Sequence, residues 1–141
     1  MLNVLAPIAA ACDRTIPPDH RRRIGIVGAG AIVDVAHLPA YARAGLDVVA
    51  IADIDGARAR DVAARHGIGS VCADADELLA DPAVQVVDIA VPAAFQPELA
   101  LRALEAGKDL ICQKPLATDL ASARTIADAA APHGRQVEIG R

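Results

Sequence analysis

A run of apolar residues that leads directly into glycines constrains this chain more than any other feature. Residues 24–30 read Ile-Gly-Ile-Val-Gly-Ala-Gly, which predicts a buried strand followed by a tight turn. At Gly28 and Gly30 the backbone can approach a pyrophosphate with no Cβ in the way. A helix starting at Ala31 and Ile32 would present its first N–H groups to the phosphates, with about half a positive charge. The sequence therefore predicts a dinucleotide site.

Asp53 strengthens this interpretation, because the glycines alone could equally form a plain turn, and the third small position of the fingerprint is Val33. Asp53 ends the second predicted strand, 23 residues after Gly30, where a carboxylate can accept hydrogen bonds from an adenosine ribose. A carboxylate there repels a 2′-phosphate and favours NAD over NADP, although Arg58 could reach such a phosphate. In the alternative, Asp53 is a turn or capping residue and Asp55 contacts the ribose.

Apolar, β-rich runs alternate with helical patterns along the rest of the chain. Strands are predicted at Ile24–Val27, Val48–Ala52, Ser70–Cys72, Val84–Val91, Asp109–Cys112 and Gln136–Ile139. Helices are predicted from Asp55 to Gly67, from the Asp74 and Glu77 capping box to Pro82, from Pro97 to Gly107, and from a Thr118 cap to Pro132 and Gly134, with Pro39 dividing Ala31–Ala44 into two pieces. This alternation predicts an α/β fold, a doubly wound parallel sheet of Rossmann type with strand order 3-2-1-4-5-6.

The length and composition fit one such domain. A chain of 141 residues is too short for two full domains. With one Phe, one Tyr and no Trp, aliphatic residues and Ala must build the core. We expect residues 1–22 to form a disordered or irregular tail and residues 23–141 to form the dinucleotide-binding domain.

Charge and cysteine usage narrow the function classes. The net charge is −4 and the only basic cluster is residues 21–23, so nucleic acid is not expected as a partner. Cys12, Cys72 and Cys112 are scattered without metal-ligand spacing, which predicts reduced thiols, a cytoplasmic location and no metal site. No apolar run reaches the roughly 18 residues of a membrane span.

A lysine follows the fifth predicted strand, in residues 110–116, Leu-Ile-Cys-Gln-Lys-Pro-Leu. Ligands of open α/β sheets bind at the carboxyl ends of the strands. Lys114 could therefore reach both cofactor and substrate, or it could equally be a solvated lysine after an edge strand.

Four stretches together carry a family resemblance from Arg23 to Arg141. They are Gly28-x-Gly30-x-Ile32 with His37-Leu38-Pro39, Ala50-Ile51-Ala52-Asp53, Asp88-Ile89-Ala90-Val91-Pro92, and Ala106-Gly107-Lys108 leading to Gln113-Lys114-Pro115-Leu116. In these stretches the chain resembles the glucose-fructose oxidoreductase and inositol dehydrogenase (Gfo/Idh/MocA) family of NAD(P)-dependent oxidoreductases. In that family a hydride passes between the nicotinamide and a sugar or polyol carbon.

The resemblance implies NAD as cofactor, with NADP possible, and Lys114 as the catalytic residue at the nicotinamide ribose and the reacting hydroxyl. A cis bond is expected before Pro115. The implied cofactor-binding residues are Gly28, Gly30, Ala31, Ile32, Asp53, Val91, Pro92, Gln96, Lys114 and Pro115.

The chain departs from the family pattern at three positions. Gln113 replaces the usual Glu before the lysine, and Ala93 and Gln96 replace an Asn and a His, although Gln96 still offers an amide. The family's substrate domain supplies the Asp and His for proton transfer, and it is absent from these 141 residues. The four histidines do not replace them, since each lies in the tail, a helix or a turn.

We therefore expect a catalytically incomplete cofactor domain that meets a sugar or polyol-like substrate only if a substrate domain is supplied. A non-catalytic module, binding a partner protein through the uncovered surface in response to the dinucleotide, is one alternative. A nonfunctional remnant is the other.

Overall fold

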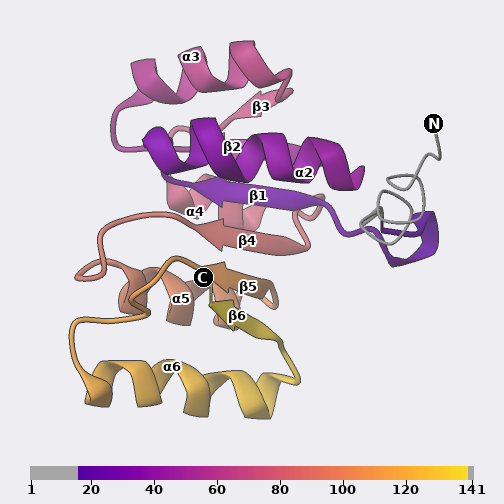
Figure 1. The fold of residues 1–141 in the computed structure, drawn as a ribbon. Helices are drawn as coiled ribbons and strands as arrows, with labels where there is room; N and C mark the ends of the chain where they lie inside the picture. Colours follow the sequence, from indigo (N-terminus) through magenta and orange to yellow (C-terminus); the bar gives the residue numbers. More distant parts are fainter. Residues whose placement is uncertain (1–15, 140–141) are drawn as a thin grey trace, which may run out of the picture.

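The computed structural model of the chain describes residues 16–139, which build one six-stranded sheet. All pairings are parallel and the order is β3-β2-β1-β4-β5-β6, which confirms the predicted doubly wound topology. In Figure 1 the strands follow one another from β3 near the top to β6 near the bottom. The strands are β1 (Ile24–Val27), β2 (Val48–Ala52), β3 (Ser70–Val71), β4 (Val86–Ile89), β5 (Asp109–Cys112) and β6 (Val137–Ile139).

Helices cover both faces of the sheet, as Figure 1 shows for α2 in front of β1 and α4 behind it. One face packs against the π-helical turn η2 (Val33–His37), α2 (Leu38–Ala44) and α3 (Gly56–His66). The other packs against α4 (Ala75–Ala80), α5 (Gln96–Glu105) and α6 (Leu120–His133). Both cores consist mainly of Ala, Val, Ile and Leu, as the composition predicts.

Helix ends agree with most of the predicted caps. Asp55 accepts the N–H groups of Ala57 and Arg58 at the start of α3, and Gly67 ends that helix with a φ of 71°. The Asp74 side chain accepts the N–H of Glu77 at the start of α4. These caps are confirmed because each depends on residues only a few positions apart.

The cap of the last helix was predicted wrongly. The N-cap of α6 is Asp119, whose side chain accepts the Ser122 N–H, while the Thr118 hydroxyl donates to Asp119. A carboxylate is the stronger acceptor and also interacts with the positive end of the helix. Pro132 lies inside α6, which ends at Gly134 with a φ of 60°.

Pro39 does not divide the helix after the glycine turn. The chain is helical from residue 31 to residue 44, and the Leu38 N–H donates to the Val33 carbonyl five residues back. In a regular α-helix the proline ring would clash with the carbonyl four residues earlier. The wider π turn, together with the place of Pro39 in the first turn of α2, accommodates the ring.

Three strands are shorter than predicted. Strand β4 spans Val86–Ile89 instead of residues 84–91, because the Val84 N–H donates to the Asp81 carbonyl in a turn. Strands β3 and β6 are also a residue shorter than the apolar runs that predicted them. Turn hydrogen bonds and pairing partners, more than apolar character, determine these limits.

The described chain begins beside the end of α2. The Ile16 N–H donates to the Ala44 carbonyl at 3.2 Å, and the Arg21 Nε donates to the Ile16 carbonyl at 2.9 Å. The short 3-10 helix η1 (Pro18–His20) lies between these contacts. Residues 1–15 of the predicted tail, Cys12 among them, fall outside the described residues, and the domain boundary stays a prediction.

No helix among residues 16–139 is both long enough and apolar enough to span a membrane.

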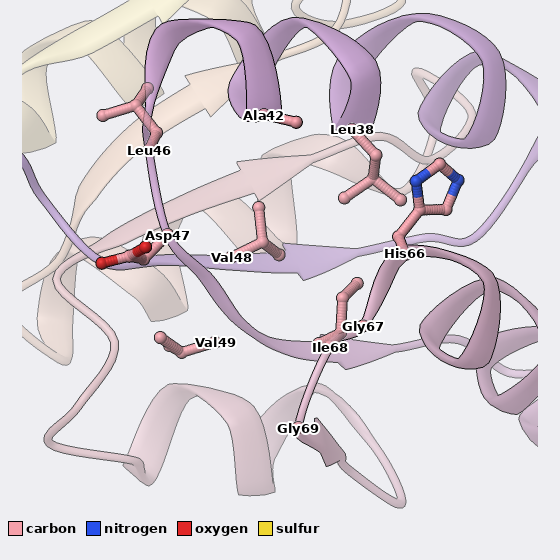
Figure 2. A pocket seen from close by; sticks show the side chains of 10 residues that line it. All are labelled: Leu38, Ala42, Leu46, Asp47, Val48, Val49, His66, Gly67, Ile68 and Gly69. Atoms are coloured by element: carbon pink, nitrogen blue, oxygen red, sulfur yellow. The ribbon is translucent and has the colours of Figure 1, made fainter.

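A pocket of about 450 Å³ lies at the amino ends of the strands, between α2, β2 and the loop after α3. Figure 2 shows the side chains of Leu38, Val48 and Ile68 lining it from these elements. It lies at the edge of the sheet opposite the glycine turn, away from the carboxyl ends where ligands of such sheets bind.

Candidate functional site

A cleft of about 500 Å³ opens at the carboxyl ends of β1, β2 and β4, beside the point where the strand order reverses. It has a mainly apolar lining, and it brings together Gly28, Gly30, Asp53, Val91 and Pro92 from the predicted cofactor residues. The predicted residues Ala31, Ile32, Gln96, Lys114 and Pro115 are not among those that line it.

Gly28 occupies a position that only glycine fits. Its φ is +105°, and a Cβ added there would lie 2.4 Å from the Ala90 carbonyl oxygen. Gly30 is different, because among residues 16–139 no atom beyond its chain neighbours lies within 4 Å of an added Cβ. The first glycine is therefore required by the neighbouring strand, while the second leaves open space at the start of the helix.

Val33, the imperfect position of the fingerprint, is fully buried in the core under this helix. Ala31 and Ile32 precede it in the first helical turn and are exposed, Ile32 to 46%. The first N–H groups of any helix have no intrahelical acceptor. The valine therefore packs against the sheet without covering the end of the helix that would meet the phosphates.

Asp53 connects β2 to the glycine turn. Its Oδ2 accepts the Ala29 N–H at 2.6 Å, and its Oδ1 accepts the Asp55 N–H at 2.7 Å and the Arg58 Nη2 at 2.8 Å. Burial acts to raise the pKa of Asp53, but these hydrogen bonds lower it below the usual value. Asp55 caps α3, while the bond from the Asp55 N–H to Asp53 Oδ1 is a turn contact of the kind that the alternative interpretation expects of Asp53.

Two glutamines hold the segment after β5. The Lys114–Pro115 bond is cis, as expected, and the Lys114 side chain is exposed. The Gln113 Oε1 accepts the Lys114 N–H at 3.0 Å, and the buried Gln96 donates its Nε2 to the Pro115 carbonyl at 2.8 Å. Gln96 thus lies beneath this segment instead of facing the cleft.

His37, in η2, contacts the same segment, and sequence reasoning missed these contacts. Its Nδ1 lies 2.6 Å from the Asp88 Oδ2, and its Nε2 lies 2.8 Å from the Gln113 Nε2. The Tyr41 hydroxyl donates to the same Asp88 oxygen at 2.8 Å. His37 was set aside because it lies in a helix. The available signal was Asp88, an acidic residue within an otherwise apolar strand.

These contacts perturb the ionisable groups. The hydrogen bond to Asp88, although opposed by burial, raises the pKa of His37. Burial and the Asp88 carboxylate raise the pKa of Tyr41, which stays a neutral phenol. Burial raises the pKa of the Cys112 thiol to about 12, so this cysteine is not a nucleophile at neutral pH.

Residues 22–141 match the family model described as "Oxidoreductase family, NAD-binding Rossmann fold", GFO_IDH_MocA. An inositol 2-dehydrogenase from Acidothermus cellulolyticus is 40% identical over 132 residues, which are 92% of this chain and 37% of that protein. An uncharacterized oxidoreductase from Rhizobium meliloti is 42% identical over 82% of this chain and 35% of that protein. The chain thus spans little more than a third of the length of these relatives.

Among solved structures, GenD2 from gentamicin A biosynthesis, in complex with NAD, superposes with a TM-score of 0.82 at 31% identity, covering 90% of this chain and 36% of GenD2. A 3-ketoreductase from Actinomadura kijaniata, in complex with NADP and TDP-benzene, gives a TM-score of 0.80 at 31% identity, covering 85% of this chain and 37% of that protein.

Proposed function

We propose, because this chain belongs to the Gfo/Idh/MocA family of oxidoreductases with an NAD-binding Rossmann fold, that its cleft binds a dinucleotide. The part of the cleft at Gly28, Gly30 and Asp53 would hold the adenosine and the pyrophosphate. We propose Lys114 as the catalytic residue at the nicotinamide end. The main observation behind the proposal is the position of the Asp53 carboxylate. It lines the cleft and also accepts a hydrogen bond from the Ala29 N–H in the glycine turn.

Asp53 retains the capacity to bind a ribose. Its Oδ2 accepts one protein N–H, whereas its Oδ1 accepts two. A carboxylate oxygen offers two lone pairs, so Oδ2 can accept one further hydrogen bond. We assign that bond to a ribose hydroxyl of the adenosine.

Arg58 bears on the choice between NAD and NADP. Its guanidinium donates to Asp53 Oδ1, whose side chain is only 7% exposed, while the Arg58 side chain itself is 47% exposed and can reach a ligand in the cleft. Asp53 favours the free ribose hydroxyls of NAD, while Arg58 offers a charge partner to a 2′-phosphate. We propose NAD as the preferred cofactor and NADP as an accepted one.

The adenine has apolar neighbours in the same cleft. Ile54 is fully exposed and Phe95 is 63% exposed, and both line the cleft together with Leu99. Exposed large apolar side chains in a cleft are typical of ligand sites. We propose that Ile54 and Phe95 contact the adenine ring.

For the whole protein we propose oxidation of a hydroxyl, or reduction of a carbonyl, on a sugar or polyol. A bound nicotinamide dinucleotide supplies the hydride chemistry, and the residues of the chain bind and orient the reactants. Lys114 follows β5 at the carboxyl edge, where its ammonium can hydrogen-bond a ribose hydroxyl and the substrate oxygen. We propose that these 141 residues alone give little turnover, since in the family the Asp and His of proton transfer come from the substrate domain.

Thermal unfolding of the full chain with NAD, NADH, NADP and NADPH tests the proposal. Ligand binding to the folded state raises the midpoint by mass action. We expect the largest rise with NAD or NADH and a smaller one with NADP or NADPH. A cooperative transition that no dinucleotide moves would reject cofactor binding by this chain.

A further inference from the structure

A continuous series of hydrogen bonds leads from the buried centre of the sheet to the backbone of Lys114. Asp88 in β4 is fully buried, and its Oδ2 meets His37 Nδ1. His37 Nε2 lies within hydrogen-bonding distance of the Gln113 Nε2, at 2.8 Å, and the Gln113 Oε1 accepts a hydrogen bond from the Lys114 N–H. The series joins η2, β4 and the segment after β5, which lie far apart in the sequence.

One arrangement of protons makes every contact of the series a hydrogen bond, with Asp88 Oδ1 left outside it and without a partner among the described residues. The Gln113 oxygen already accepts the Lys114 N–H, so the Gln113 nitrogen, which can only donate, faces His37. His37 must then accept through an unprotonated Nε2, and its Nδ1–H donates to Asp88. The geometry therefore selects the neutral imidazole with the proton on Nδ1.

We propose that His37 is a positioning residue for the Lys114 segment. Asp88 orients the imidazole of His37, which accepts a hydrogen bond from the Gln113 Nε2. This bond orients the Gln113 side chain so that its Oε1 accepts the Lys114 N–H. The inference rests on the proposed function in one respect, namely that Lys114 contacts the dinucleotide. His37 itself touches neither cofactor nor substrate and acts through Gln113.

Protonation of His37 breaks this arrangement. A charged imidazole carries a hydrogen on Nε2, so two donors would face each other between His37 and Gln113. If the amide turns to offer its oxygen to His37, the Lys114 N–H loses its acceptor. Lowering the pH through the pKa of His37 must therefore loosen the Lys114 segment.

The residue at position 113 decides whether this conflict exists. A glutamate has acceptors only, so it can accept from a charged His37 and from the Lys114 N–H together. The glutamine of this chain accepts from one side only. Gln113 is thus compatible with neutral His37, whereas a glutamate at this position favours the charged form.

The other ionisable groups around His37 do not titrate in its place. On α2, Tyr41 donates to Asp88 and stays neutral, since its pKa is raised. On β5, the Cys112 thiol has a pKa of about 12. On η2, Asp34 is paired with Arg65 and His66 of α3. Asp88 raises the pKa of His37, and the Gln113 donor opposes that shift because it binds the neutral form.

Nuclear magnetic resonance of the ligand-free full chain tests the positioning role without any cofactor. Side-chain ¹⁵N shifts should place the proton of neutral His37 on Nδ1. Exchange protection of the Lys114 amide should fall roughly fivefold to tenfold as His37 becomes charged. In Gln113→Glu the protection should persist through the His37 titration. Two results would overturn the proposal. One is a neutral His37 that carries its proton on Nε2, and the other is a wild-type Lys114 amide whose exchange protection does not change as His37 titrates.

His66 is the matched control, because it also pairs with an aspartate, at 2.8 Å from Asp34, but its hydrogen bond joins α3 to η2 and does not involve Gln113. Replacing His66 by Ala should leave Lys114 protection and its pH dependence unchanged. If His66→Ala abolishes the pH dependence, the effect arises elsewhere and the assignment to His37 is wrong.

NAD affinity separates this inference from the proposed function. Wild-type affinity should fall about fivefold below the His37 pKa, while Gln113→Glu should show no such fall. If NAD does not bind at all, the proposed function fails while the exchange data still decide the role of His37. If NAD binds with the same pH dependence in both proteins, cofactor binding stands and the link from His37 to Lys114 is refuted.

Discussion

The Asp53 carboxylate and the Ala29 backbone N–H form a 2.6 Å hydrogen bond, which fixes the end of β2 against the glycine turn after β1. The same side chain thus holds the turn and faces the cleft. Replacing Asp53 by Ala should lower NAD affinity about tenfold, through loss of a charge-assisted bond, and NADP affinity by less. Titration calorimetry with both cofactors measures this.

Asp55→Ala is the matched control for that change. It removes the N-cap of α3 and should cost about 1 kcal/mol of stability, while NAD affinity stays within about twofold of the wild type. Equal losses of affinity in both variants would mean that the Asp53 effect is structural.

Replacing Arg58 by Ala should weaken NADP more than NAD. The guanidinium contributes a charge partner to a 2′-phosphate, so NADP affinity should fall roughly tenfold and NAD affinity by less than about threefold. Arg60→Ala, an exposed arginine on the same helix, should change neither. A larger loss for NAD would indicate that Arg58 serves only to orient Asp53.

The lowered pKa of Asp53 predicts a stability difference in acid. Its folded-state pKa lies below the unfolded value, so its ionised form contributes stability that is complete above the unfolded pKa and is lost as the pH falls through the folded pKa. The stability advantage of the wild type over Asp53→Asn should be greatest above about pH 5 and should shrink in more acidic solution. Urea unfolding of both proteins across this range measures it, and a constant difference would contradict the assignment.

The two glycines of the turn should respond differently to alanine. Gly28→Ala forces a Cβ to within 2.4 Å of a backbone oxygen at a positive φ, so the variant should be strongly destabilised. In Gly30→Ala the new Cβ has no close neighbour in the described part of the chain beyond the adjacent residues, so the variant should fold normally but bind NAD more weakly if the pyrophosphate passes there. Circular dichroism melting and NAD titration distinguish these outcomes; unchanged affinity in Gly30→Ala would place the pyrophosphate elsewhere.

Lys108 stabilises the fold, and its contribution to the free energy of unfolding can be measured. Its Nζ donates to the Asp81 and Val84 carbonyls, each at 2.8 Å, and the residue is 7% exposed. Lys108→Met leaves both carbonyls without this donor and should cost roughly 1–3 kcal/mol. Arg124→Met, on the exposed side of α6, should stay within about 0.5 kcal/mol of the wild type in the same urea titration.

The features that sequence reasoning predicted correctly depend on near neighbours or on a repeated pattern. The strand Ile24–Val27, the Asp55 and Asp74 caps and the sheet order follow from local spacing and from the alternation of strands with helices. The Thr118 cap failed because two adjacent residues could both cap, and only their geometry separates them.

The parts of the site that sequence reasoning missed depend on contacts between distant residues. His37 lies 51 residues before Asp88 and 76 before Gln113, so no pattern in the neighbouring sequence predicts its contacts with them. The hydrogen bond from Gln96 at the start of α5 to the Pro115 carbonyl, 19 residues further on, was likewise not foreseen. Predicting such contacts requires the relative placement of β4, α5 and β5, which a single sequence does not contain.

The π turn at Val33–His37 also limits how the chain can vary in length. In a regular α-helix, with about 100° of rotation per residue, side chains five positions apart would point about 140° apart, whereas the wider π turn brings Val33 and Leu38 to the same core. Both side chains are buried against the same core, and His37 between them must meet Asp88. A one-residue deletion at exposed Val35 would leave Val33 and Leu38 four positions apart, still on one helical face, but would remove the π turn that accommodates the Pro39 ring. We expect this interval to tolerate substitution far better than insertion or deletion.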